Sequence, residues 1–307
     1  MRSLILLLIV SLAYCNEPII PIPQKVNYNK NRAKLGMTLF SDPNLSSDGT
    51  VACVSCHSFE YGGADPRPVS IGVRGLKGNA NAPTVYNSYF NFRQFWNGRA
   101  KNLYEQADGP IHNPVEMGMD KTQVEKYLNS NSYYIEKFKE IYKSKPTYEN
   151  MIDAIVEFEK ALYTPNSKFD KFLRKEIKLS KNELEGYKIF KMAGCITCHN
   201  GINVGGNSFQ KLDLIIPYKW ENYYPDRYQI TKDNRDKNIY KVPTLRNIAL
   251  TAPYFHDGSI KSLKESIRKM VYHNLGYELE NDEVNKIEIF LKTLTGEKPK
   301  ILNMDEK

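Results

Sequence analysis

Apolar side chains recur at helical spacing in several separate segments of the chain. This spacing places them on one face of a helix, where they pack against a neighbour. Some of these helices are expected to begin at a serine or threonine that is followed three residues later by glutamate, because the two side chains satisfy free backbone N–H groups in the first turn. The pattern predicts helices at 31–40, at about 122–142 (capped by Thr122 and Glu125), at 149–163, at 183–190 (Ser180 and Glu183), from Ser262 and Glu265 through Met270, and at 282–294.

Two stretches, 58–120 and 200–250, show no such period and are rich in Gly, Pro, Asn and Tyr. Loops of this length in a compact protein are usually functional or disordered. Residues 164–167 interrupt the helical pattern around Pro165. We therefore expect a mainly α protein with little strand, built from two domains, 16–165 and 166–307, that a short linker joins. The last residues could pack back on the first domain.

The composition is that of a soluble globular protein, with 307 residues of which 41% are hydrophobic and 25% charged. The formal charge of +8 comes from scattered lysines. No basic stripe interleaved with aromatic residues is present, which argues against nucleic-acid binding. A basic surface could help to steer an acidic redox partner.

The first 15 residues have the pattern of a secretory signal peptide. Arg2 precedes a short apolar run, which is too short to span a bilayer because a spanning helix takes roughly 20 residues. No later segment is long and apolar enough either, so a periplasmic protein is expected. Cys15 could carry a lipid, although Tyr14 stands where lipoprotein signals have a small residue.

The other four cysteines form two CxxCH motifs, 53–57 and 195–199. Disulfides would suit an exported protein, and a zinc ion could draw on all four thiols. The adjacent histidines favour c-type haem, because two thiols at this spacing attach one porphyrin and the next histidine binds its iron. The motifs thus predict two covalent haem c groups, attached through Cys53, Cys56, Cys195 and Cys198, with His57 and His199 as proximal ligands. A helix ending in phenylalanine precedes each motif, which indicates two cytochrome c-like domains.

The chain resembles the bacterial di-haem cytochrome c peroxidases over almost its whole mature length. The likeness lies in ordered blocks that are more specific than CxxCH. They include Ser70-Ile71-Gly72, Asn81-Ala82-Pro83-Thr84-Val85-Tyr86-Asn87, Phe95-Trp96-Asn97-Gly98-Arg99-Ala100, Asn113-Pro114-Val115-Glu116-Met117, Val242-Pro243-Thr244-Leu245-Arg246-Asn247 and Thr251-Ala252-Pro253-Tyr254-Phe255-His256-Asp257-Gly258.

The resemblance implies different roles for the two haems. The N-terminal haem would reduce H₂O₂, with Glu116 as the acid–base residue and Gln106 as its polar neighbour. Heterolysis of HOOH needs a proton moved from the inner to the outer oxygen, which one carboxylate can do. The C-terminal haem would accept electrons from a small cytochrome c or cupredoxin, with Met270 as its second ligand. His273 is a weaker substitute ligand and is expected at the surface.

Three further features follow from the resemblance. Trp96 matches a tryptophan that lies between the haems and is proposed to help electrons cross. Asn81, with the carbonyls of Thr251 and Pro253, matches a calcium site between the domains. Family members are often dimers, so a homodimer is a further expectation.

One position departs from the family pattern. In many members a histidine follows Ser-Ile-Gly and ligates the peroxidatic iron until the other haem is reduced; here the residue is Val73. We therefore expect a five-coordinate or water-bound iron that needs no reductive activation, with His112 as a less favoured sixth ligand. Two alternatives remain open: a pure electron-transfer cytochrome, and a relative of the di-haem enzyme that oxidises a precursor of methylamine dehydrogenase. In that enzyme a tyrosine replaces the methionine, so Met270 favours the peroxidase.

Overall fold

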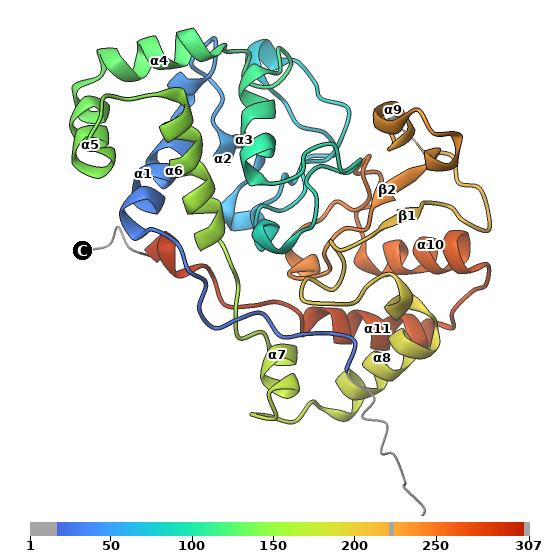
Figure 1. Cartoon of the computed structure of the whole chain (residues 1–307). Helices are drawn as coiled ribbons and strands as arrows, with labels where there is room; N and C mark the ends of the chain where they lie inside the picture. Colours follow the sequence, from blue (N-terminus) through green and yellow to red (C-terminus); the bar gives the residue numbers. More distant parts are fainter. Residues whose placement is uncertain (1–16, 221–223, 304–307) are drawn as a thin grey trace, which may run out of the picture.

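The computed structural model describes residues 17–220 and 224–303 and is mainly helical, as the sequence predicts (Figure 1). One short antiparallel pair of strands, β1 and β2, joins Phe209 to Lys241 in register. The elements are α1 (Lys30–Phe40), α2 (Cys53–Cys56), α3 (Leu103–His112), α4 (Lys121–Ser130), α5 (Ser132–Tyr142), α6 (Tyr148–Ala161), α7 (Lys168–Leu173), α8 (Lys181–Met192), β1 (Phe209–Lys211), α9 (Tyr228–Thr231), β2 (Ile239–Lys241), α10 (Leu263–Leu275) and α11 (Asn281–Lys292).

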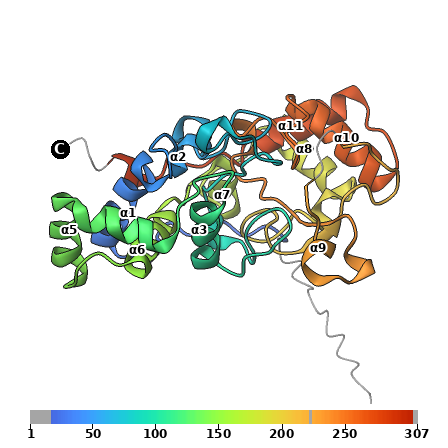
Figure 2. The same cartoon turned by 90° about the horizontal axis from the view of Figure 1, so that it is seen from above.

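The chain forms two lobes that lie side by side (Figures 1 and 2). In the first lobe α1 crosses α6, and in the second α8 crosses α11. Both crossings are centred on a glycine: a Cβ on Gly36 would overlap the carbonyl of Ala154, and one on Gly186 would overlap the carbonyl of Lys286. The same helix-pair scaffold therefore occurs twice, since only glycine allows backbones to approach so closely.

The long segments that follow the CxxCH motifs repeat each other as well. Asn87 and Asn247 have φ angles of 62° and 61°, and Phe95 and Phe255 have φ angles of 66° and 67°. Each pair is separated by 160 positions in the sequence. The two lobes thus carry the same loop conformation, which relates their residues pair by pair.

These repeated loops meet between the lobes through two matching hydrogen bonds. The backbone N–H of Asn81 donates to the carbonyl of His256 (2.8 Å), and that of Lys241 donates to the carbonyl of Trp96 (2.7 Å). Asn81 corresponds to Lys241, and Trp96 to His256, at the same separation of 160 positions. The contact between the lobes therefore has an approximate twofold symmetry.

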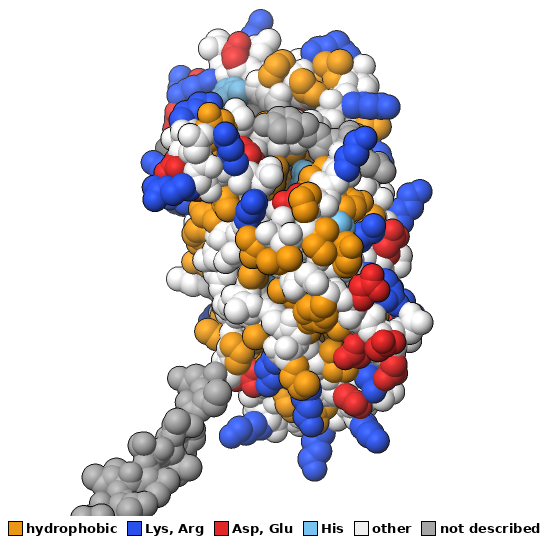
Figure 3. Space-filling model, turned by 90° about the vertical axis from the view of Figure 1, so that its right-hand side faces the viewer, with side chains coloured by type: hydrophobic (Ala, Val, Ile, Leu, Met, Phe, Trp, Pro, Cys, Tyr) orange, Lys and Arg blue, Asp and Glu red, His pale blue; other side chains and the backbone are white. Residues whose placement is uncertain are grey.

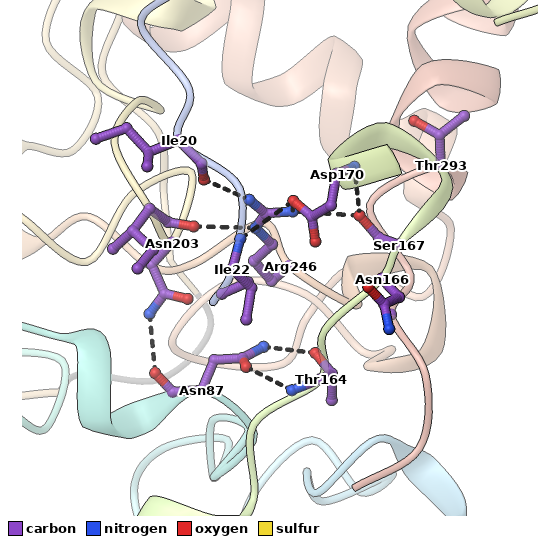
Figure 4. Close-up of polar contacts among 12 residues, drawn as sticks. Ile20, Ile22, Asn87, Thr164, Asn166, Ser167, Asp170, Asn203, Arg246 and Thr293 are labelled. Atoms are coloured by element: carbon purple, nitrogen blue, oxygen red, sulfur yellow. Dashed lines mark hydrogen bonds and ion pairs between the residues drawn. The ribbon is translucent and has the colours of Figure 1, made fainter. Parts of the chain in front are cut away.

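The two ends of the chain cross between the lobes. Ile19 belongs to the apolar core of the second lobe, whereas Ile301 belongs to that of the first. A buried ion pair of Arg246 and Asp170 (2.6 Å) anchors the N-terminal segment, because Arg246 donates to the carbonyl of Ile20 (2.9 Å) (Figure 4). The predicted division at residue 165 falls between α6 and α7, and the packing of both chain ends ties the two lobes together.

Three predicted elements need correction. Thr122 does not cap a helix over 122–142: Asp120 and Gln123 form the capping box, and the helix breaks at Asn131, whose side chain caps α5. Helix α3 lies in a stretch that was expected to be a loop. The expectation was wrong because Gly109 and Pro110 interrupt the helical pattern of apolar residues. Helix α10 continues past Met270 to Leu275, which places the methionine inside the helix.

Candidate active site

The first CxxCH motif opens onto a cavity of about 330 Å³ in the N-terminal lobe. Cys53, Cys56 and His57 line this cavity. The Nδ1 of His57 faces the carbonyl oxygen of Gly63 at 3.3 Å, and burial lowers the pKa of the imidazole. A neutral ring that donates from Nδ1 leaves Nε2 as a free ligand, the usual arrangement of a metal-binding histidine.

The second motif repeats this arrangement around a cavity of about 540 Å³. The Nδ1 of His199 faces the carbonyl oxygen of Val204 at 3.3 Å, and burial lowers the pKa of the ring to about 4. Phe40 and Phe190 stand beside the two histidines, with ring centroids 6.3 Å and 6.5 Å away. Both histidines are therefore held neutral and oriented by the same contacts.

The cysteines fit haem better than the alternatives. All four described cysteines are free, so they form no disulfide. Burial raises the pKa of Cys53 and of Cys195 to about 12, so both thiols are protonated in the free cavities. Within residues 17–220 and 224–303, no group of three His, Cys, Asp or Glu side chains could hold a metal ion. Two separate apolar cavities, each with two thiols and a free imidazole nitrogen, suit two covalent haems.

The first cavity also contains the two predicted polar residues, Glu116 and Gln106. Burial raises the pKa of Glu116, while the Nδ2 of Asn113, which donates to its Oε1 at 2.7 Å, and the charge of Arg99 act in the opposite direction. Acid–base catalysis is most effective when the pKa of the catalytic group lies near the working pH, and a raised pKa brings a carboxyl group closer to this condition at neutral pH. The structure thus brings Glu116 and Gln106 to the same cavity as His57.

Two further residues of this cavity were not assigned a role from the sequence. Arg99 donates from Nη1 to the hydroxyl of Tyr224 (2.7 Å), and its guanidinium lies 3.3 Å from the ring centroid of Phe95. Burial raises the pKa of Tyr224, so the phenol stays protonated. Arg99 lies in a block that signalled the family, whereas Tyr224 arrives from the second lobe and carried no sequence signal.

Glu159 is a second buried carboxyl group in the first cavity. It is 3% exposed, its Oε2 has no hydrogen-bond partner, and burial raises its pKa to about 8. In the second lobe the corresponding position is Leu291, because Phe158 and Phe290 face the equivalent glycines of the two helix crossings. The two cavities therefore differ in polarity at a matched site.

Met270, the predicted second ligand, lines the second cavity together with His199. The Nδ2 of Asn274 donates to its sulfur at 3.1 Å, which orients the thioether. Helices α3 and α10 begin at equivalent residues, Leu103 and Leu263. Counted from these starts, Met270 on α10 occupies the position that corresponds to Pro110 on α3. Pro110 also lines its cavity, but its side chain has no donor atom that can bind iron.

Neither substitute ligand lies in a haem cavity. His273 was expected at the surface, but it is buried: its Nδ1 faces the carbonyl oxygen of Ile216 at 2.8 Å, and the ring packs against Tyr218. His112 faces away from the first cavity, with Nδ1 2.8 Å from the carbonyl oxygen of Met119 and Nε2 3.1 Å from the Tyr148 hydroxyl. Both histidines hold loops in place.

Val73 is fully buried and does not line the first cavity. Its backbone N–H donates to the carbonyl oxygen of Glu116 (2.9 Å). The next residue, Arg74, donates from its backbone to Asp48 (2.6 Å) and from Nη2 to the carbonyl of Pro114 (3.3 Å). The Val73 loop is thus attached to the segment that carries Glu116.

Trp96 and Asn81 line both cavities. The indole Nε1 donates to the carbonyl of Asn81 (2.9 Å), and the ring lies 6.3 Å from His256. The Nδ2 of Asn81 donates to the carbonyls of Asp65 (3.1 Å) and Arg67 (2.8 Å), which leaves Oδ1 as a possible cation ligand. Thr251 and Pro253, the other predicted calcium ligands, line the second cavity.

The fold and the two cavities define a two-domain c-type cytochrome. Residues 30–178 match the di-haem cytochrome c peroxidase family, and residues 184–295 match cytochrome c. The cytochrome c551 peroxidase of Nitrosomonas europaea is 48% identical over 286 residues, which cover 92% of this chain and 86% of that protein. The corresponding protein of Pseudomonas aeruginosa is 39% identical and is covered to 85%, again over 92% of this chain.

Solved structures agree with this assignment. The crystal structure of a MauG-like protein associated with microbial copper homeostasis has a TM-score of 0.79 at 28% identity, covering 91% of this chain and 93% of that one. The chain therefore belongs to the di-haem cytochrome c peroxidase family, and it is a cytochrome c peroxidase with two haem c domains.

Proposed function

We propose that peroxide is reduced in the first cavity with Glu116 as the acid–base residue, and that electrons arrive through the second. The observation that carries this proposal is the difference between two equivalent helices. Met270 on α10 would supply a thioether ligand to an iron in the second cavity, whereas the side chain of Pro110 on α3 has no ligand atom for an iron in the first. A haem in the first cavity would therefore meet no thioether from α3, and the half-buried carboxyl group of Glu116 lines the same cavity.

The haem iron supplies the site where peroxide binds and receives the electrons. Glu116 takes the proton from the inner oxygen of HOOH and passes it to the outer oxygen, which leaves as water. The net reaction, H₂O₂ + 2e⁻ + 2H⁺ → 2 H₂O, needs two more protons to complete both water molecules. Asn113 fixes the carboxyl group through its hydrogen bond to Oε1, so one oxygen remains free for the transfer.

Arg99 and Tyr224 complete the polar side of this cavity. The positive charge of Arg99 favours the ionised form of Glu116 and would stabilise negative charge on the peroxide as its O–O bond breaks. Tyr224 positions the guanidinium through the 2.7 Å hydrogen bond. Gln106 offers a further amide to orient the substrate.

We further propose that the enzyme needs no reductive activation. Valine cannot bind iron, and the buried Val73 is attached to the Glu116 segment through its backbone. Glu116 already lies in the cavity in this arrangement. Cyanide should therefore bind the fully oxidised protein without added reductant, as a shift of the haem absorption band; absence of binding until reduction would contradict this proposal.

Electrons are proposed to cross by way of Trp96, which lines both cavities. A small cytochrome c or cupredoxin is the proposed donor. The face of the molecule on the side of α10 gathers apolar side chains at its centre, with basic ones toward its top and bottom (Figure 3). Apolar centres with a charged rim are typical of transient interfaces. A Trp96→Phe variant with slower electron transfer between the haems would support the path.

Calcium is proposed at the contact between the lobes, bound by Asn81 Oδ1 and the carbonyls of Thr251 and Pro253. Oxygen ligands of this kind suit Ca²⁺, with water completing the shell. Elemental analysis of the purified protein tests the proposal, and absence of calcium at full haem content would contradict it.

A periplasmic location is proposed from the signal-like residues 1–15. These residues, with Cys15, lie outside the described part of the chain. None of the described helices is long and apolar enough to cross a membrane. Fractionation of cells tests the location, and sedimentation of the purified protein tests the proposed homodimer.

Stopped-flow peroxide consumption with a reduced small cytochrome c tests the central proposal. We expect Glu116→Gln to lower turnover by roughly 10² to 10⁴-fold, the usual contribution of acid–base catalysis, with both haems intact. Glu60→Gln, which removes an exposed carboxyl group, is the control. Unchanged turnover in Glu116→Gln would remove this residue from the mechanism. If the wild type does not turn over peroxide but transfers electrons normally, the electron-transfer cytochrome is favoured. If it instead oxidises a protein substrate, the relative of the enzyme that acts on the methylamine dehydrogenase precursor is favoured.

A further inference from the structure

Lys241 is a buried lysine in the wall of the second cavity. It ends strand β2, is 6% exposed, and lines the cavity together with His199 and Met270. Two contacts fix its backbone. Its N–H donates to the carbonyl of Trp96 in the first lobe, and it pairs with Phe209 of strand β1 in the second. The side chain is therefore held inside the protein by its backbone position.

The ammonium group has no counter-charge in the described chain. Among residues 17–220 and 224–303, no carboxylate lies close enough to form an ion pair that would affect the pKa of this ammonium group. Burial lowers the pKa of Lys241 to about 8, and no charge nearby opposes that effect. An unpaired buried ammonium is costly, so such groups are normally paired.

The position has a counterpart without charge. Asn81 occupies the equivalent place in the first lobe, where its amide donates to two backbone carbonyls (3.1 Å and 2.8 Å). The lobe contact therefore does not itself require a lysine. The cation is specific to the second cavity, and the missing anion must come from what fills that cavity. Haem c carries two propionate groups, which are carboxylates.

We propose that Lys241 forms an ion pair with a propionate of the second haem and raises the reduction potential of that haem. A nearby positive charge favours the reduced iron, which carries one positive charge fewer than the oxidised iron. This inference rests on haem c in the second cavity and does not depend on the peroxide chemistry at Glu116.

A spectroelectrochemical titration of the complete di-haem protein tests the proposal. Lys241→Met should lower the midpoint potential of the second haem and leave that of the first unchanged, whereas Lys241→Arg, which keeps the charge, should stay close to wild type. Lys237→Met is the matched control, because it removes an exposed lysine that water screens. An unchanged potential in Lys241→Met at full haem content would overturn the proposal.

A crystal structure of the haem-loaded wild type gives a second readout that does not depend on the variant folding. The Nζ of Lys241 should lie within about 4 Å of a propionate oxygen of the second haem. A longer separation, or pairing with a carboxylate of the chain, would overturn the proposal. Neither result bears on Glu116, so this inference and the peroxidase mechanism can fail separately.

Discussion

The two haem cavities share a scaffold and differ in a few side chains. Both lie under a helix crossing centred on a glycine, and both hold a histidine whose Nδ1 faces a backbone carbonyl at 3.3 Å. A thioether stands in one cavity where the other has Pro110, and the buried Glu159 stands where the other has Leu291. The repeated backbone thus gives both lobes the same scaffold around their CxxCH motifs, and the proposed division of roles between the two haems rests on the side chains that differ at matched positions.

The contact between the lobes shows the same principle. Trp96 and His256 occupy equivalent positions and have their rings 6.3 Å apart, so neither lobe alone builds this contact. Asn81 and Lys241 form matching backbone bonds but carry different side chains. An approximately symmetric frame thus holds two different haem environments at one interface.

Placing the methionine of α10 at the matched position of α3 should have the largest effect on peroxide turnover. Pro110→Met places a thioether where the second cavity has Met270, so it should close the first iron and reduce peroxide turnover to near background. Pro110→Leu, which has similar bulk and no sulfur, is the control. Stopped-flow turnover and the spin state of the first haem give the readout. Full turnover with an open iron in Pro110→Met would show that α3 and α10 are not equivalent.

Replacing Glu159 with a residue that does not titrate should change how stability depends on pH. The folded protein holds this proton up to a pKa of about 8, whereas the ordinary value is 4.5. The free energy of unfolding should therefore fall as pH rises from about 4.5 to 8, by on the order of a few kcal/mol. Glu159→Gln should lose this part of the slope in urea unfolding, and Glu60→Gln should retain it. Equal slopes in Glu159→Gln and wild type would contradict the assignment.

The equivalence of the two helix crossings can be tested with alanine. Gly36→Ala and Gly186→Ala should each lower the free energy of unfolding by about 1–3 kcal/mol, because the added methyl meets a backbone carbonyl. Gly78→Ala has room for a methyl and should change little. Urea unfolding gives the measurement. A loss confined to one of the two crossings would break the comparison between the lobes.

The smallest expected effect concerns the pH profile of turnover. Asn113 holds the pKa of Glu116 down through its hydrogen bond, against the burial that raises it. Glu116 takes a proton only as the carboxylate, so the acid limb of kcat/KM should move to higher pH in Asn113→Ala. Asn129→Ala, on α4, should leave the profile unchanged. A limb that stays in place or moves to lower pH in Asn113→Ala would contradict the role of this contact.

Much of the fold and part of the site could be predicted from the sequence, for identifiable reasons. CxxCH is a local motif, and the helices with strong apolar faces lie close to their predicted positions. Helix α3 was missed because Gly109 and Pro110 interrupt its pattern, although tertiary packing keeps it helical. His273 was misplaced because a polar residue on a helix gives no sign that a distant loop covers it.

The remaining site residues depend on contacts that no local pattern encodes. Tyr224 reaches Arg99 from 125 positions along the chain. Glu159 and Lys241 become notable only when their burial and their counterparts, Leu291 and Asn81, are known. Matched positions in the repeated scaffold therefore carried more information about function than periodicity did.

The electron paramagnetic resonance spectrum of the fully oxidised, as-purified protein tests the central claim most directly. An open first iron and a second iron bound by Met270 predict one high-spin and one low-spin haem, with equal amounts of each. A spectrum with only low-spin haem would contradict the account, because it would mean that side chains close both irons before peroxide arrives.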